Sequence, residues 1–80
     1  MTESIRLIWD FRGRTAEGTA RHQSRHLAEF AVREHLATGG TGAEAVTEIH
    51  WIAWMLVAPS DVERLRQVLR PHRALPGEPV

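Results

Sequence analysis

Hydrophobic and polar residues alternate near the start of the chain, in the segment IRLIWDFR at residues 5–12. The apolar positions of this alternation are Ile5, Leu7, Trp9 and Phe11. Successive side chains of a strand point to opposite faces, so a period of two residues predicts a strand that buries one face. Gly13 follows the last polar position and ends the predicted strand.

The period then lengthens to that of a helix, from Thr15 to about Leu36. At about 100° per residue, one stripe of this helix carries Ala16, Ala20, Gln23, Leu27, Phe30, Ala31 and Glu34. The largely apolar stripe predicts an amphipathic helix with Thr15 as its N-cap. Val32 and Leu36 lie off the stripe, where a partner can cover them. The segment ATGGTGA, residues 37–43, predicts a flexible turn.

Residues 44–58, EAVTEIHWIAWMLVA, are rich in β-branched and aromatic side chains, which predicts a strand. The segment contains no Gly, Pro, Asn or Asp on which to turn. As one strand it would measure about 50 Å at roughly 3.3 Å per residue, longer than strands usually are. The sequence therefore predicts either a long bent strand or two short strands joined at a bulge or kink near His50–Trp51. Residues 51–57 are apolar on both faces, so both faces are predicted to be covered.

A second helix is predicted over PSDVERLRQVLR, residues 59–70. Ser60 and Glu63 have the spacing of a capping box, and Pro71 ends the helix. Residues 71–80 form a tail that is too rich in Pro and Gly for regular structure, although HRAL within it leaves room for a short edge pairing.

These elements predict a single α+β domain over residues 1–80. It is a small two-layer β-α-β-α unit with two parallel strands and room for a short extra strand. Two strands make a poor sheet, and the strand at residues 51–57 needs more cover than one subunit supplies. Homodimerisation is therefore predicted to complete the fold. The alternative is a ferredoxin-like βαββα unit with its hairpin near His50, which predicts self-association as well.

Composition narrows the range of partners and compartments. The chain has ten basic and ten acidic residues and no formal net charge, which argues against nucleic acid or an anionic membrane as a partner. Cysteine is absent, which excludes disulfides, thiolate metal sites and cysteine nucleophiles. The N-terminal residues lack the pattern of a signal peptide, and the longest apolar run, WIAWMLVA, is too short to span a bilayer. We therefore expect a soluble, cytoplasmic protein.

A pair of histidines, His22 and His26 in the segment HQSRH, lies on one face of the first predicted helix. Histidines four residues apart can chelate zinc or another transition metal, as in the H-E-x-x-H motif of zinc proteases. Here glutamine replaces the glutamate that acts as general base, so protease chemistry is not supported. Two ligands are too few for a zinc site, and the candidates for a third are His50, Asp10 and Glu29. The alternative is a pair of histidines that is solvated or lies at an interface.

A second candidate site is a place for a small anionic ligand. Its candidate ligand-binding residues are Asp10, Arg12, Arg14, Arg21 and Arg25. The first three surround the corner between the first strand and the first helix, which is a usual position for an anion, and the last two continue a basic strip along that helix. The alternatives are an ordinary tight turn and a solvated helix face, on which Arg25, Glu29 and Arg33 have the spacing of two ion pairs.

No catalytic arrangement is visible in the sequence. One of the three serines is Ser60, the predicted cap, and no pair of carboxylates is placed for acid–base work. The sequence therefore predicts a small homodimeric binding or interaction protein with no cofactor, rather than an enzyme. Two alternatives stay open: a metal-binding protein that uses His22 and His26, and a protein with a small-anion pocket at the corner between strand and helix.

Overall fold

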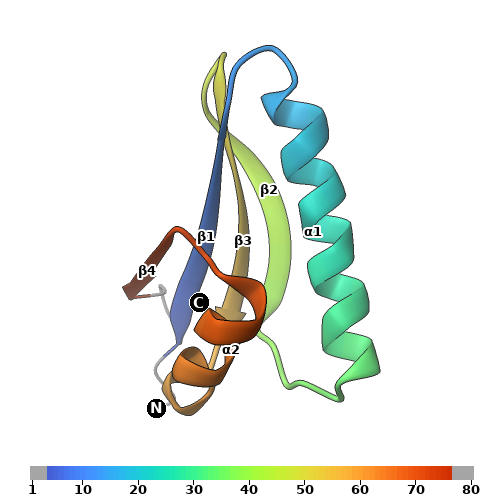
Figure 1. Cartoon of the computed structure of the whole chain (residues 1–80), viewed down its shortest axis with the longest axis vertical. Coiled ribbons are helices and arrows are strands. Elements are labelled where there is room, and N and C mark those ends of the chain that lie inside the picture. The colour runs from blue at the N-terminus through green and yellow to red at the C-terminus, as the bar shows by residue number, and fades with distance from the viewer. Residues whose placement is uncertain (1–3, 77–80) are drawn as a thin grey trace.

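The computed structural model describes residues 4–76. In chain order its elements are β1 (Ile5–Arg12), α1 (Ala16–Arg33), β2 (Gly40–Thr47), β3 (His50–Val57), α2 (Val62–Leu69) and β4 (Arg73–Pro76). The four strands of this part of the chain form one antiparallel sheet in the order β2-β3-β1-β4, accompanied by the two helices (Figure 1). The predicted α+β class is confirmed. The predicted tail contributes β4, and its residues 77–80 lie outside the described range.

β1 and β3 form the centre of the sheet and run antiparallel over eight residue pairs, from Ile5–Val57 to Arg12–His50. The prediction of two parallel strands in a β-α-β-α unit is therefore wrong. A crossover through α1 does join β1 to β2, but β3 turns back between these two strands and pairs with both. The element order β-α-β-β-α-β is that of ferredoxin-like units. It contains the hairpin of the ferredoxin-like alternative and one strand more, β4.

Of the two alternatives for residues 44–58, one long bent strand or two short strands, the structure has two strands, β2 and β3, which form a hairpin. Its turn falls at Glu48 and Ile49, and β2 begins at Gly40, inside the segment expected as a flexible turn. Two hydrogen bonds hold a turn that has no Gly or Pro. The Ile49 N–H donates to Thr47 Oγ1 at 3.3 Å, and the Gly13 N–H donates to the Ile49 carbonyl at 2.8 Å. The second bond comes from the corner after β1, so tertiary structure helps to fix the position of the turn.

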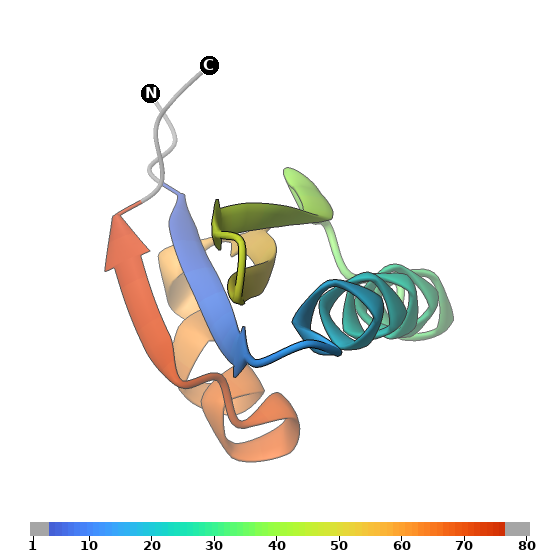
Figure 2. The ribbon, with the colours of Figure 1, turned by 90° about the horizontal axis from the view of Figure 1, so that it is seen from above.

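Both helices pack on the same side of the sheet (Figure 2). The core between them and the sheet contains Leu7, Trp9, Leu27, Ala31, Ala53, Met55, Val57 and Leu65. The strand residues in this set alternate along β1 and β3, and α1 contributes residues from its predicted stripe. Leu36, which was expected off the stripe, packs against this core, whereas Val32 stays exposed.

The helix ends differ from the predicted caps. Thr15 makes no side-chain hydrogen bond to the start of α1. Ser60 lies inside a short 3-10 turn, η1 (Pro59–Asp61), and does not cap α2. At the other end of α2, the Trp9 Nε1–H donates to the carbonyl of Leu69 at 3.0 Å. This core tryptophan thereby provides a partner for one of the carbonyls that a helix end leaves unpaired.

A tryptophan from β3 lies across the face of the sheet that the helices do not cover. The ring of Trp54 rests on β2, because a Cβ added to Gly42 would come within 2.6 Å of that ring and one added to Gly40 within 3.7 Å. The Arg6 guanidinium lies over the ring, 5.1 Å from its centroid, and donates to Glu44 at 3.2 Å. Glycine in β2, tryptophan in β3 and arginine in β1 therefore form one stack across three strands.

Replacing Gly42 by alanine is expected to destabilise the fold by about 1–3 kcal/mol, because the new methyl group would overlap the Trp54 ring. The matched control is Gly18→Ala in α1, where an added Cβ meets no atom within 4 Å. That change is expected to stabilise the protein by roughly 0.5–1 kcal/mol, because alanine favours a helix more than glycine does. Urea unfolding curves measure both effects, and an unchanged midpoint in Gly42→Ala would contradict the stack.

Candidate functional site

Side chains from three strands meet at Asp10 on the uncovered face of the sheet. Arg73 of β4 donates from Nε to Oδ2 and from Nη2 to Oδ1 of Asp10, both at 2.9 Å, which makes a bidentate pair. His50 of β3 places its Nε2 2.8 Å from Oδ1 of the same carboxylate. The Asp10 and His50 side chains are only 16% and 13% exposed. One carboxylate thus joins β1 to both of its neighbours in the sheet.

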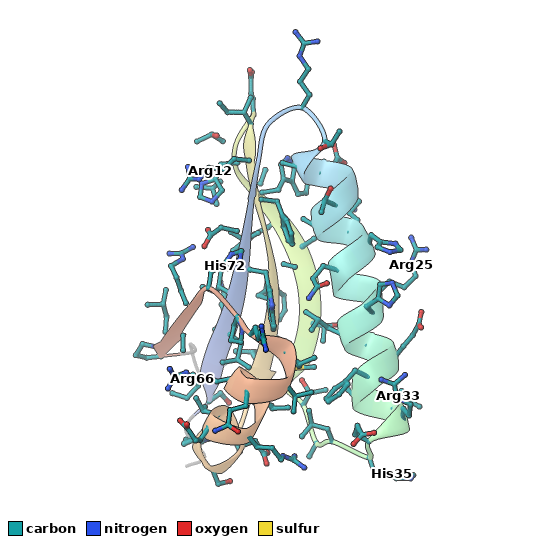
Figure 3. The ribbon with its side chains drawn as sticks, viewed as in Figure 1. Arg12, Arg25, Arg33, His35, Arg66 and His72 are labelled. Atoms are coloured by element: carbon teal, nitrogen blue, oxygen red, sulfur yellow. The ribbon has the colours of Figure 1, made fainter. Side chains whose placement is uncertain are left out.

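His72 lies in the segment between α2 and β4 (Figure 3) and contacts the backbone of the same aspartate. The Asp10 backbone N–H donates to His72 Nδ1 at 2.8 Å, and the His72 backbone N–H donates to the Ile8 carbonyl at 2.8 Å. Because Nδ1 accepts this bond, the ring proton of the neutral imidazole is on Nε2. We call Asp10, His50, His72 and Arg73 the Asp10 cluster.

The carboxyl group of Asp10 is held in its charged form. Burial on its own raises the pKa of Asp10, but the hydrogen bonds from Arg73 and His50, together with the charges of these two residues, outweigh it. The pKa of Asp10 therefore lies below its ordinary value of 3.8. At neutral pH the arginine faces a full negative charge, which strengthens the bidentate pair.

The polar groups of the Asp10 cluster satisfy one another. Throughout residues 4–76, no buried side-chain nitrogen or oxygen lacks a hydrogen-bond partner. A histidine held by an aspartate can serve in proton transfer. Here, however, Asp10 is shared between His50 and Arg73, and these contacts tie three strands together. We therefore interpret the Asp10 cluster as a structural feature that holds β3 and β4 in position beside β1.

The residues predicted to bind an anion are spread over the molecule. Arg12 lies beside the sheet and Arg25 points outward from α1, on opposite sides of the structure (Figure 3). Arg21 donates to Glu17 at 2.9 Å and lies over the ring of Trp51, 5.1 Å from its centroid. Asp10 is engaged in its cluster, and Arg14 is exposed at the corner after β1. The structure does not bring the five candidates together, and a smaller anion site at the corner stays a prediction.

The ion pairs along α1 also differ from the expected ones. Arg33 lies 3.9 Å from Glu34, its neighbour in the chain, and its guanidinium lies over the ring of Phe30. The ion pairs of the described residues do not include Arg25 or Glu29. The predicted series Arg25–Glu29–Arg33 is therefore wrong, because these side chains extend toward solvent or toward other partners.

His22 and His26 do meet, on the exposed surface of α1, with their Nε2 atoms 2.9 Å apart. His50 does not join them, since it is bonded to Asp10 on the face of the sheet opposite the helices. Within the range 4–76, no group of three or more His, Cys, Asp or Glu residues is arranged to hold a metal ion. The site with His50 as third ligand is therefore not assembled, and binding by the two helix histidines stays a prediction.

A groove runs between α1 and the outer strand β2. Its volume is about 440 Å³, and its lining residues are Ala28, Ala31, Val32, His35, Leu36, Thr38, Gly40 and Thr41. Val32 is 78% exposed, more than any other large hydrophobic residue of the described chain. Because Leu36 packs against the core, Val32 is the off-stripe residue that stays exposed.

Sequence reasoning missed the contribution of His72 and Arg73 to the Asp10 cluster, because both belong to the tail expected to be irregular. One signal was present in β1: Asp10 is an acidic position in a strand that becomes central, and a carboxylate with little exposure needs a cation. That signal predicts a basic partner for Asp10 but does not identify which residue it is.

No family model, curated protein sequence or solved structure matches this chain. Neither helix within residues 4–76 combines the length and the apolar composition needed to cross a membrane. The function of this protein therefore has to be inferred from the geometry of its own residues.

The Asp10 cluster is expected to make the free energy of unfolding depend on pH in the acid range. The native pKa of Asp10 is lowered, so its stabilisation is present above about pH 4 and is lost as the pH falls through the lowered pKa. Asp10→Asn is expected to cost roughly 1–3 kcal/mol at neutral pH, since its charged hydrogen bonds are weakened. The variant should also lose less stability than the wild type between about pH 5 and about pH 2.

Urea unfolding at several pH values measures this dependence. The matched control is Asp61→Asn, which removes a carboxylate paired with Arg64 near the surface and should cost less than about 1 kcal/mol. If the free energy of unfolding fell equally with decreasing pH in Asp10→Asn and in the wild type, Asp10 would not be the group responsible for the acid dependence.

Proposed function

We propose that this chain is a protein-interaction module that pairs with a second copy of itself along β2. The observation that carries the proposal is a long outer strand without proline beside a groove, in which a register shift between Ala45 and Thr47 affects only the last residues. β2 presents the N–H and C=O groups of its free edge, and the adjoining groove leaves Val32 uncovered. A strand added at this edge makes backbone hydrogen bonds to β2 and places side chains against the groove.

The two outer strands differ in how they resist pairing. β4 has four residues and ends at Pro76, which has no N–H to donate. β2 has eight residues and no proline, and its one charged residue, Glu44, is held by Arg6 over the face of the sheet. Outer strands that avoid pairing are usually short or carry charged residues or proline. By this criterion β2 is the edge suited to a partner.

The uncovered face of the sheet is a weaker candidate for docking. Ile8 and Ile52 lie on that face, yet only 2% and 5% of their surface is exposed. The same face carries Arg6 stacked on Trp54 and, beside them, the Asp10 cluster. A subunit placed over it would remove these charges from water, which costs free energy. Pairing along the sheet edge is therefore favoured over the stacking of two sheets.

A second copy suits this edge because the chain is small. A domain of about 80 residues buries a modest part of its surface and gains stability from a partner, disulfides or a metal. This chain has no cysteine. Two copies related by a two-fold axis would pair β2 with β2 and join their four-stranded sheets into one. The same axis brings the Val32 flanks of the two α1 helices toward each other.

The wild-type protein is expected to sediment as a dimer at micromolar concentration. Val32→Glu should weaken association by about tenfold or more, because dimerisation would then bury a carboxylate. The matched control is Val68→Glu on α2, a residue that is 59% exposed and belongs neither to β2 nor to the lining of the groove, and it should leave the dimer intact. Sedimentation velocity from about 1 to about 100 µM measures the populations.

Circular dichroism and urea unfolding separate a loss of association from a loss of folding, because both substituted positions are exposed. Hydrogen exchange supplies a second measurement. The exchange rates of the outward N–H groups of β2 should fall only when the dimer forms. A wild-type monomer at about 100 µM would overturn the proposal, as would equal effects of Val32→Glu and Val68→Glu.

A further inference from the structure

We propose that His22 and His26 form a surface site for a divalent ion of tetragonal geometry, copper(II) in preference to nickel(II) and zinc(II). The two imidazoles stand one turn apart on α1, and their Nε2 atoms converge to 2.9 Å. Their rings meet edge to face, with centroids 4.4 Å apart and an interplanar angle of 79°. The site lies on α1 itself and does not depend on the pairing of β2.

The distance between the two nitrogens allows both to bind one ion, and the known affinities of divalent ions for imidazole decide which ion is preferred. Imidazole nitrogen binds a divalent metal at about 2.0–2.1 Å. Two such ligands are about 2.9 Å apart when they subtend a right angle, and about 3.3–3.4 Å apart at the tetrahedral angle. The 2.9 Å separation of His22 and His26 lets both nitrogens occupy adjacent corners of a square plane, the arrangement that copper(II) and nickel(II) prefer, with little movement of the side chains. Copper(II) also binds nitrogen ligands more tightly than nickel(II) or zinc(II) does.

A hydrogen bond between two neutral rings accounts for the same distance in the absence of metal. One Nε2–H then donates to the other Nε2. Both residues are exposed, so water competes for this bond and its net contribution to stability is small. When a metal ion binds, it accepts a lone pair from each Nε2, and the ring that donated the hydrogen bond then carries its single proton on Nδ1, by exchange with water. The pair is therefore already close to the arrangement that binding requires.

The surroundings of the pair favour an exchangeable ion over a permanent structural one. No third His, Cys, Asp or Glu from residues 4–76 completes the set, so water fills the other positions around the ion. Arg25 and Arg33 project from the same helix, and their positive charges oppose a cation (Figure 3). Arg33 is partly neutralised by Glu34. We expect a dissociation constant in the micromolar range.

Binding links two successive turns of α1 and adds stability to the folded chain by mass action. Copper(II) should therefore raise the urea midpoint of the wild-type protein and leave that of His26→Ala unchanged. This measurement reports on the site through folding and needs no enzymatic activity.

The direct test titrates the full chain with copper(II), nickel(II) and zinc(II) chloride by calorimetry, in a buffer that does not bind metals. We expect one copper ion per chain and the affinity order copper, nickel, zinc. His22→Ala and His26→Ala should each weaken copper binding by about tenfold or more, since each removes one of two ligands. His35→Ala, which changes an exposed histidine just after α1, is the matched control and should bind as the wild type does.

Electron paramagnetic resonance of the copper(II) complex counts the nitrogen ligands, and we expect two in the wild type and one in each single variant. Unchanged copper affinity in His26→Ala, an equal loss in His35→Ala, or tighter binding of zinc than of copper would overturn the proposal. Self-association is measured with chelator present, so a negative result for one proposal is distinguishable from a negative result for the other.

Discussion

The eight-pair register between β1 and β3 is the constraint on which the rest of this structure depends. Directly opposed residues of an antiparallel pair share a face, so Leu7 and Met55 lie together under the helices while Asp10 and Ile52 lie together on the uncovered face. A slip of one residue would exchange the two faces of a strand. It would carry the charged Asp10 into the core, away from Arg73, and an unpaired buried charge is strongly destabilising. The core and the Asp10 cluster therefore select the same register from opposite faces of the sheet.

Periodicity predicted β1 and α1 because each buries one face, and the positions of apolar residues record which face that is. It failed to decide whether residues 44–58 turn and where, because Glu48 and Ile49 are not typical turn residues and Gly13, far away in the sequence, helps to hold them. It failed again over the first half of β2. There Gly42 was predicted to belong to a flexible turn, whereas its small size is required by the ring of Trp54. Both failures arise where a tertiary contact decides the local conformation.

The candidate site was predictable to a smaller extent than the fold. The sequence indicated Asp10 and His50 as chemistry-bearing residues, but it offered them as alternative third ligands for the helix histidines and did not pair them with each other. Their contact depends on the strand order, which no pattern along a single strand encodes. Arg73 enters through β4, which contributes four residues from a tail rich in Pro and Gly. By contrast, His22 and His26 meet as their spacing predicted, because that contact lies within one helix.

For the assembly proposed above, the difference between the two outer strands has a consequence for the number of chains that can join. If β2 of one molecule were able to add to β4 of the next, the sheet would extend without end, as in an open helical filament. The shortness of β4 and the proline at its end oppose that head-to-tail contact. In the dimer proposed above, pairing of β2 with β2 would engage both of the edges suited to a partner and leave only the two β4 edges outside. Two chains would then form a closed pair, and the protected β4 edges would oppose the growth of a fibre.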